Sequence, residues 1–439
     1  MSDLSLQTQR ELERIYPLIE HPVQRALIED TARFKVVPAG RRSGKTERAK
    51  RYVASMALRN PGEAYFIAAP TRDQVKKIYW QDMKRLCVPS LFCTRKAPSE
   101  TELTIFLDNG TQIQLIGLDR PERIEGVFWS GGVIDEIADI KPEAWEANIR
   151  PALDTYNPTR PDYRAWCWLI GVPDGLNHYY DMAEYARTAN DPDWKLYHWK
   201  SSDILPEATI AAARRQMSPK QFKQEYEASF ETASGRIYED YGPANYTSEA
   251  VQPHEQLCWY HDFNYTPMSS GVGVIREGKV YCLEEIILTS AVARQSAMEF
   301  VDRYKDHKNK RVMIYGDPSG RKGEKHGHAS DYTEIEAVLR SNGWSYTRRV
   351  HPSTESIKDG QNAVRAKICN AAGEVALFVN PTTAPYTHKA LATGQLKKGS
   401  TFIEEESEFQ HIGTAVRYFV EYEFPIQSRS VTPIRLGGI

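Results

Sequence analysis

The strongest constraint on the fold is the segment of residues 39–46, which reads AGRRSGKT. It follows an apolar run at residues 34–38 and precedes a helix-like stretch at residues 47–58. A glycine-rich turn between a strand and a helix gathers backbone N–H groups at a helix N-terminus, where they bind phosphate. The segment departs from the common G-x-x-x-x-G-K-T pattern at Ala39, where glycine is usual. We therefore expect a strand, a phosphate-binding turn and a helix within a mostly parallel α/β sheet.

The chemistry of this turn predicts ATP and a Mg²⁺ ion as its ligands. Gly44 lets the backbone approach a phosphate, Lys45 reaches the β- and γ-phosphates, and the Thr46 hydroxyl coordinates Mg²⁺. An arginine beside the phosphates, Arg41 or Arg42, can stabilise the γ-phosphoryl group during transfer, and we favour Arg41. The predicted ATP-binding residues of the turn are Gly40, Arg41, Arg42, Ser43, Gly44, Lys45 and Thr46.

An apolar run that ends in two acids supplies the other half of such a site, because residues 131–136 read GGVIDE. Asp135 is expected to hold the Mg²⁺ shell, and Glu136 is expected to orient or deprotonate the attacking water. A strand ending in Asp-Glu is a weak signal alone and a strong one beside the turn at residues 39–46. Arg123 is a further candidate arginine finger, acting on a neighbouring subunit.

The second half of the chain has a different order of elements. Its predicted strands and helix lie at residues 257–263, 271–275, 280–283, 293–304 (the helix) and 311–315. Three antiparallel strands followed by α/β alternation predict an RNase H-like fold. Turn-forming residues at 234–243 mark a linker between the halves.

Length and charge limit the class of protein. The chain has 439 residues, roughly three times the length typical of one domain, so two domains are expected. Its net charge of −2 excludes a protein that coats nucleic acid through bulk positive charge. No apolar stretch approaches the roughly 18 residues needed to cross a bilayer, so no membrane is expected as a partner.

These features resemble the large terminase subunit of tailed bacteriophages. Residues 40–46 match the arginine-bearing Walker A motif of that family, and residues 131–136 match its Walker B motif. Gln24, upstream of the first strand, matches its adenine-reading glutamine. Residues 171–180, GVPDGLNHYY, resemble its coupling segment, except that Val172 stands where Thr or Ser is usual. The resemblance covers essentially residues 20–425.

The resemblance implies an α/β protein that packages viral DNA. ATP hydrolysis would move double-stranded DNA into a procapsid, and a metal-dependent endonuclease would cut concatemeric DNA. The implied partners are the portal protein, the small terminase subunit and further copies of the chain, commonly in a pentameric ring, in the cytoplasm of the infected bacterium. The expected domains are a P-loop ATPase domain of RecA/ASCE type at 1–233 with a helical lid or linker subdomain at about 176–233, a linker at 234–250, an RNase H-like nuclease domain at 251–426 and a flexible C-terminal tail at 427–439.

The nuclease of this family holds two Mg²⁺ or Mn²⁺ ions with converging carboxylates. Asp262 and Asp317 each follow an apolar run, where a strand end exposes a carboxylate, and both match family positions. Either Glu284 or Glu285 is a candidate supporting ligand. Strand alternation puts only one of them on the site's face, and we favour Glu285.

The third acid of the family motif has no counterpart here. Residues 409–418 read FQHIGTAVRY, so Thr414 or Ala415 stands at its place, depending on alignment. Three outcomes are open: Glu408 substitutes from the preceding turn, His411 binds metal, or the site binds its second ion weakly.

A basic segment follows Asp317 directly. Residues 303–325 contain eight basic and three acidic residues, a net charge of +5. We predict a sequence-independent, salt-sensitive contact with the DNA backbone. The residues expected to make it are Arg321, Lys322 and Lys325.

Two other functions compete with the packaging enzyme. One is a host-type ATP-dependent helicase or translocase with a nuclease, and the absence of a second RecA-like pattern weighs against it. The other is an assembly protein that binds ATP and DNA and has an impaired nuclease site, for which the missing third acid leaves room.

Overall fold

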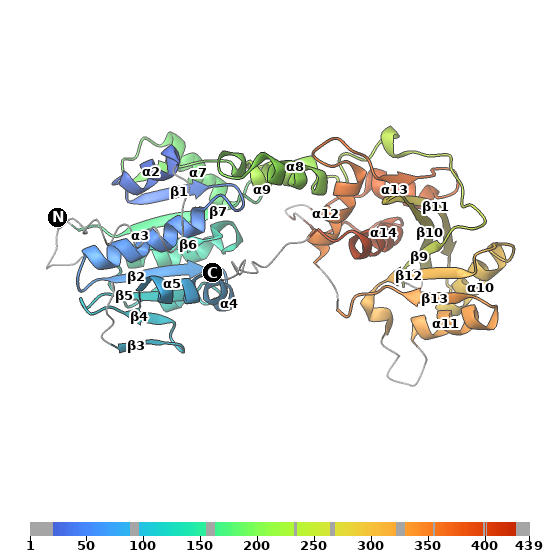
Figure 1. Cartoon of the computed structure of the whole chain (residues 1–439), viewed down its shortest axis with the longest axis horizontal. Coiled ribbons are helices and arrows are strands. Elements are labelled where there is room, and N and C mark those ends of the chain that lie inside the picture. The colour runs from blue at the N-terminus through green and yellow to red at the C-terminus, as the bar shows by residue number, and fades with distance from the viewer. Residues whose placement is uncertain are drawn as a thin grey trace, which may run out of the picture. The chain divides into compact units, whose positions relative to one another are not determined.

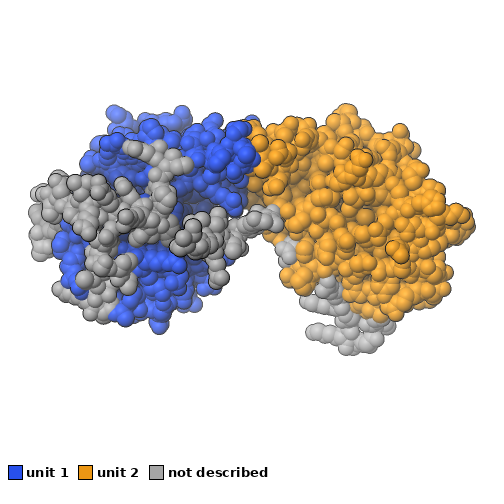
Figure 2. Space-filling model, viewed as in Figure 1, with its two compact units in different colours: residues 1–210, 223–232 blue, residues 211–222, 233–439 orange. Residues whose placement is uncertain are grey.

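The computed structural model describes residues 21–87, 96–154, 163–231, 235–263, 268–321, 330–353, 356–397, 400 and 402–426. Its contacts divide the chain into two compact units, which Figure 1 shows as ribbons and Figure 2 as surfaces. The first unit comprises residues 1–210 and 223–232, and the second comprises residues 211–222 and 233–439. Each unit has its own sheet.

An eight-stranded sheet forms the centre of the first unit, in the order β3-β4-β5-β2-β6-β7-β1-β8. The strands from β5 to β8 in that order run parallel, and β3 and β4 add an antiparallel edge. The strand bounds are β1 (Phe34–Pro38), β2 (Ala64–Ala69), β3 (Lys96–Ser99), β4 (Thr104–Phe106), β5 (Gln112–Gly117), β6 (Gly131–Asp135), β7 (Trp166–Gly171) and β8 (Trp194–Leu196).

Helices cover both faces of this sheet, so the central strands β1, β2, β6 and β7 are buried along their whole length. Apolar residues of α3, η1 and α5 form the core on one face, and those of η4 and α7 form it on the other. The helices of the first unit are α2 (Pro22–Glu29), α3 (Lys45–Arg59), α4 (Arg72–Val75), η1 (Lys76–Trp80), α5 (Gln81–Cys87), η2 (Pro121–Ile124), η3 (Ile137–Asp139), η4 (Ala144–Ile149), α6 (Arg150–Leu153), α7 (His178–Thr188) and η5 (Ser201–Asp203). Helices α8 (Glu207–Gln216) and α9 (Pro219–Tyr226) each contain residues of both units.

A six-stranded mixed sheet forms the centre of the second unit, in the order β13-β12-β9-β10-β11-β14. Its middle strands β9, β10 and β11 are antiparallel, while β12 runs parallel to β9 and β14 parallel to β11. The strand bounds are β9 (Leu257–Asp262), β10 (Met268–Arg276), β11 (Lys279–Leu288), β12 (Arg311–Gly316), β13 (Ser345–Arg348) and β14 (Leu377–Val379).

Helices also cover both faces of the second sheet. Residues of α10 and α11 form the core on one face, and those of α12, α13 and α14 form it on the other. The helices of this unit are η6 (Pro243–Asn245), α10 (Ala293–Arg303), η7 (Pro318–Arg321), α11 (Asp331–Ser341), α12 (Ile357–Ile368), α13 (Pro385–Thr393) and α14 (Gln410–Glu423). Within the described ranges, no helix of either unit combines the length and apolar character needed to cross a membrane.

The region expected as a helical subdomain, residues 176–233, is divided differently in the structure. Its strand β8 pairs with β1 and so belongs to the main sheet. Residues 211–222 group with the second unit. One reason is a backbone hydrogen bond, in which the Ala371 N–H donates to the Met217 carbonyl at 2.7 Å. No sequence pattern indicates this pairing, because the two residues are far apart in the chain.

Candidate functional site

The turn from β1 to α3 requires glycine at two positions. A Cβ atom on Gly40 would lie 2.5 Å from the Ser201 backbone nitrogen and 2.6 Å from the Tyr226 carbonyl oxygen, so no side chain fits there. Gly44 has a φ of 88°, in the left-handed region that glycine favours. Helix α3 begins at the next residue, Lys45, and its first N–H groups have no partner within the helix.

Two residues predicted to bind Mg²⁺ are in contact. The Thr46 hydroxyl donates to Asp135 Oδ2 at 3.1 Å, and the Tyr79 hydroxyl donates to the same oxygen at 2.5 Å. Burial raises the pKa of Asp135 to about 6, and the neighbouring Glu136 adds to the rise, while Lys45 opposes it. Hydroxyl and carboxylate oxygens are ligands that Mg²⁺ prefers, so these residues fit the predicted ion.

The sequence did not identify Tyr79. It lies in the π-helical turn η1, and its side chain is fully buried. Burial raises its pKa well above the ordinary value, and Asp135 contributes, so the phenol stays protonated and donates. A π-helical turn within a longer helix occurs often at functional sites, but it has no sequence signature that could have identified this residue.

Glu136 lies beside Lys45 at the end of β6. Its Oε1 is 3.9 Å from Lys45 Nζ, and its Oε2 accepts a hydrogen bond from the Val172 N–H at 3.4 Å. The φ of Glu136 is 52°, an uncommon value for a residue with a side chain. The predicted coupling segment thus contacts Glu136 through the backbone N–H of Val172, at the position where the family resemblance leads one to expect a side-chain hydroxyl.

Gln24, the predicted adenine-reading residue, is bonded to the turn. Its Nε2 donates to the Ser43 carbonyl at 2.7 Å, and its Oε1 accepts from Arg48 Nε at 2.9 Å. The residue is 2% exposed. The structure therefore places Gln24 beside the predicted phosphate site, with both ends of its amide already paired with protein groups.

The three candidate arginines lie in different surroundings. Arg41 Nη1 is 3.0 Å from Glu225 Oε2, on the last turn of α9. Arg42 and Arg123 are exposed, and Arg42 has a φ of 57°. The sequence did not identify Glu225, because an acid near the end of a helix has no distinguishing pattern.

In the second unit, Asp262 and Asp317 come at the ends of two adjacent parallel strands. Gly316 pairs with His261, so the two aspartates follow side by side. Asp262 Oδ2 lies 2.9 Å from Nδ1 of His411, near the start of α14. This hydrogen bond raises the pKa of His411, against the opposing effect of burial.

Thr414, and not Ala415, shares the face of α14 that carries His411. Along this helix His411, Thr414 and Tyr418 are partly exposed at helical spacing, whereas Ala415 is fully buried in the core. Burial raises the pKa of Tyr418 to about 12, and both aspartates of the preceding paragraph contribute to the rise. Thr414 therefore stands between two side chains that lie near the aspartates.

The predicted glutamate ligands have other surroundings. Both carboxylate oxygens of Glu285 accept hydrogen bonds from α13: Tyr386 N at 2.8 Å, and Thr387 N and Oγ1 at 2.9 and 3.0 Å. Burial raises the pKa of Glu285. Glu284 accepts from the Tyr304 hydroxyl at 2.7 Å, and Glu408 is exposed. In the described part of the chain, no group of three His, Cys, Asp or Glu side chains is placed to hold a metal ion.

The predicted DNA-binding loop lies largely outside the described residues. Arg321 ends the short helix η7 directly after Asp317. Lys322 and Lys325 lie outside the described ranges, as does the predicted tail at 427–439.

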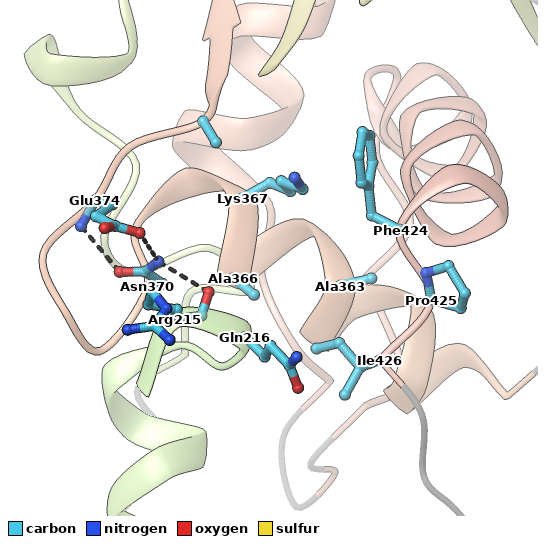
Figure 3. Close-up of a pocket in the computed structure, with 11 residues that line it drawn as sticks. Arg215, Gln216, Ala363, Ala366, Lys367, Asn370, Glu374, Phe424, Pro425 and Ile426 are labelled. Atoms are coloured by element: carbon cyan, nitrogen blue, oxygen red, sulfur yellow. Dashed lines mark hydrogen bonds between the residues drawn. The ribbon is translucent and has the colours of Figure 1, made fainter. Parts of the chain in front are cut away.

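A cavity of about 430 Å³ in the second unit contains none of the predicted site residues (Figure 3). Its polar groups are largely paired with one another. Asn370 Nδ2 donates to Glu374 Oε2 and to the Arg215 carbonyl, both at 2.9 Å. Lys367 Nζ lies 3.5 Å from the centre of the Phe424 ring, and burial lowers its pKa.

Comparison with known proteins gives relatives of one kind. Proteins named terminase, large subunit, from Thermus phage G20c and Escherichia phage T5 are 24% identical over 249 residues and 26% identical over 229 residues, covering 50% and 51% of this chain. The chain spans about half the length of these curated relatives. No protein-family model matches the chain.

Solved structures extend the similarity of fold to nearly the whole chain. The large terminase of a thermophilic bacteriophage has a TM-score of 0.58 and 16% identity, covering 96% of this chain and 99% of that chain. The same protein in complex with ADP has a TM-score of 0.57 and 17% identity, covering 95% and 99%. A complex of that protein with ATP-gamma-S has a TM-score of 0.55 and 17% identity, again covering 95% and 99%.

Proposed function

We propose that the chain is the large subunit of a phage terminase: an ATP-driven translocase for double-stranded DNA joined to an endonuclease. The observation that carries the proposal is the meeting of Lys45, Thr46, Asp135 and Glu136 at one end of the first sheet. The similarity of fold to a phage large terminase over almost the entire chain supports it. The portal, the small subunit, a ring of further copies and the host cytoplasm are part of this proposal.

Each residue of the first site has a distinct task in ATP hydrolysis. Mg²⁺ would neutralise charge on the phosphates, and Thr46 and Asp135 would hold its shell. Lys45 would bind the β- and γ-phosphates. Glu136, which lies 3.9 Å from Lys45 here, would give up this contact and orient the attacking water. Arg41 would stabilise the charge on the transferred phosphoryl group.

The nuclease part of the proposal rests on Asp262 and Asp317, which are carboxylates at adjacent strand ends. The described residues do not supply a third acid to this pair. One observation favours a second candidate for this unit, an impaired nuclease that still binds DNA. Thr414 occupies the face of α14 where an acid would complete the site.

ATP hydrolysis by the purified chain tests the first half of the proposal. Lys45→Ala should abolish both nucleotide binding and hydrolysis, whereas Glu136→Gln should keep binding and lose hydrolysis by a factor of about 100 or more. Lys195→Ala, which removes an exposed lysine bonded to Asp30, is the matched control. Unchanged hydrolysis in Lys45→Ala would place the nucleotide elsewhere.

Plasmid cleavage with Mn²⁺ or Mg²⁺ distinguishes the two candidates for the second unit. Thr414→Asp should raise cleavage above that of the wild type, because it adds an acid on the face of α14 from which His411 contacts Asp262. Thr414→Asn introduces a side chain of the same shape as aspartate but without its charge, and it should not raise cleavage. If wild type cleaves strongly and Thr414→Asp adds nothing, the existing residues already suffice and the impaired-nuclease candidate is wrong.

A further inference from the structure

Glu225, near the C-terminal end of α9, bonds to Arg41 in the loop between β1 and α3 through both its backbone and its side chain. The Arg41 N–H donates to the Glu225 carbonyl at 2.6 Å, and Arg41 Nη1 donates to Glu225 Oε2 at 3.0 Å. On the other side, the Ser201 hydroxyl donates to the Arg41 carbonyl at 2.7 Å. The backbone at Arg41 is thus fixed from two sides, and its guanidinium is directed to a carboxylate.

In its pairing with Arg41, the Glu225 carboxylate occupies the guanidinium in the way that a phosphate group would. A guanidinium binds carboxylate and phosphate oxygens through equivalent charge-assisted hydrogen bonds, so the two anions compete for it. The Arg41 side chain is 35% exposed and that of Glu225 is 21% exposed, so the pair is reachable by solvent and can open without unfolding the core. The neighbouring Lys45 faces a different acid, Glu136.

The same turn of α9 also contacts the segment that follows β7. Gln224 Nε2 donates to Asp174 Oδ1 at 3.2 Å. Asp174 lies two residues beyond Val172, whose N–H contacts Glu136. Two adjacent residues of α9, Gln224 and Glu225, therefore contact the segment after β7 and the turn between β1 and α3, respectively.

We propose that Glu225 is a positioning residue that holds Arg41 while no triphosphate is bound and yields it to the γ-phosphate of ATP. This inference rests on the proposed ATPase. Because ADP has no γ-phosphate, ADP leaves the pair of Arg41 and Glu225 closed. The last turn of α9 thereby distinguishes the triphosphate from the diphosphate.

Calorimetric binding of ATP-gamma-S and ADP in the presence of Mg²⁺ tests the proposal. Glu225→Gln keeps the backbone hydrogen bond and removes the competing charge. It should tighten ATP-gamma-S binding by about 2- to 5-fold, the range expected for a partly exposed ion pair, and change ADP binding by less. In the Arg41→Ala background, Glu225→Gln should change neither affinity.

The matched control is Glu184→Gln, which breaks an exposed ion pair with Arg187 on α7 and should leave both affinities unchanged. Three results would overturn the inference: unchanged or weaker ATP-gamma-S binding in Glu225→Gln, an equal change for ADP, or an effect that persists without Arg41. If Glu225→Gln does not fold, Glu225→Asp, which shortens the reach to Arg41, replaces it with the same expectations. A wild-type chain that binds neither nucleotide would instead contradict the proposed ATPase itself.

Discussion

Asp135 is a buried carboxylate at the predicted Mg²⁺ site of the first unit, and two hydroxyl groups orient it. It is 1% exposed, and it accepts hydrogen bonds from the hydroxyls of Thr46 and Tyr79. A carboxylate that binds a metal shell is usually oriented by such outer hydrogen bonds, which fix its direction and its charge. In the proposed Mg²⁺ site, Tyr79 would be such an outer partner of Asp135.

Tyr79→Phe should raise the Mg²⁺ concentration needed for half-maximal ATP hydrolysis by about tenfold, because the variant loses only the hydroxyl that orients Asp135. The measurement is a Mg²⁺ titration of hydrolysis at saturating ATP. Tyr185→Phe removes an exposed tyrosine–aspartate hydrogen bond on α7 and serves as control. A Mg²⁺ dependence equal to that of the wild type would assign Tyr79 a packing role alone.

The hydrogen bond between His411 and Asp262 should control the protonation of the His411 ring. The pKa of His411 lies above its ordinary value because the carboxylate favours the protonated ring. In Asp262→Asn this pKa should fall, since burial then acts without the opposing charge. Titration of ¹³C-labelled histidines by NMR measures it, with His411→Gln to assign the signal. A pKa that stays the same in Asp262→Asn would mean that the two side chains do not interact in solution.

The candidate residues separate into those with and without a local signature. Lys45 and Thr46 belong to one short motif after a buried strand, and Asp135 ends another buried strand. Because parallel strands of one sheet end at the same edge, the contact between Thr46 and Asp135 could be predicted. Tyr79 and Glu225 reach the site from other helices with no motif of their own. Their roles depend on helix register and packing, which the sequence does not display.

Among the elements, α2 is notable because a buried lysine holds its C-terminal end. Lys35 Nζ, on β1, donates to the Leu27 and Asp30 carbonyls at 2.8 and 2.6 Å. These last carbonyls of a helix carry partial negative charge and attract a cation. Since Gln24 lies on the same helix, Lys35 fixes the position from which Gln24 bonds to the turn.

Burial lowers the pKa of Lys35 to about 8, from 10.5. The unfolded chain therefore binds more protons at this residue between those values, and the stability of the wild type should rise with pH through this window. Relative to Lys35→Met, the wild type should gain about 2 kcal/mol between pH 8 and pH 10. Denaturant unfolding at several pH values measures the difference, and Lys141→Met, at an exposed lysine, should show no such gain. A gain that is the same for both variants would contradict the assignment to Lys35.

Strand and helix order was largely predictable because buried parallel strands have a distinctive apolar pattern. Both units have an α/β sheet, as the alternation of apolar runs predicts. The position of residues 211–222 was not predictable, because helical residues there look alike whichever core they join. Their grouping follows from long-range contacts such as the one between Met217 and Ala371.

At the scale of the whole molecule, the net charge of −2 is compatible with a motor that moves along DNA. Such a protein needs local, reversible backbone contacts, and a uniformly basic surface would hold DNA in place. The segment at 303–325 carries a net charge of +5 beside Asp317 and is the predicted place for one such contact.

In the proposed function, ATP hydrolysis in the first unit drives DNA movement, and a DNA-packaging assay measures this coupling. The wild-type chain, with procapsids and portal of its phage, should convert added DNA to a nuclease-protected form when ATP is present. Lys45→Ala, or wild type with ATP-gamma-S, should protect none. A wild-type chain that hydrolyses ATP rapidly yet protects no more DNA than Lys45→Ala would contradict the packaging motor and favour a host-type translocase.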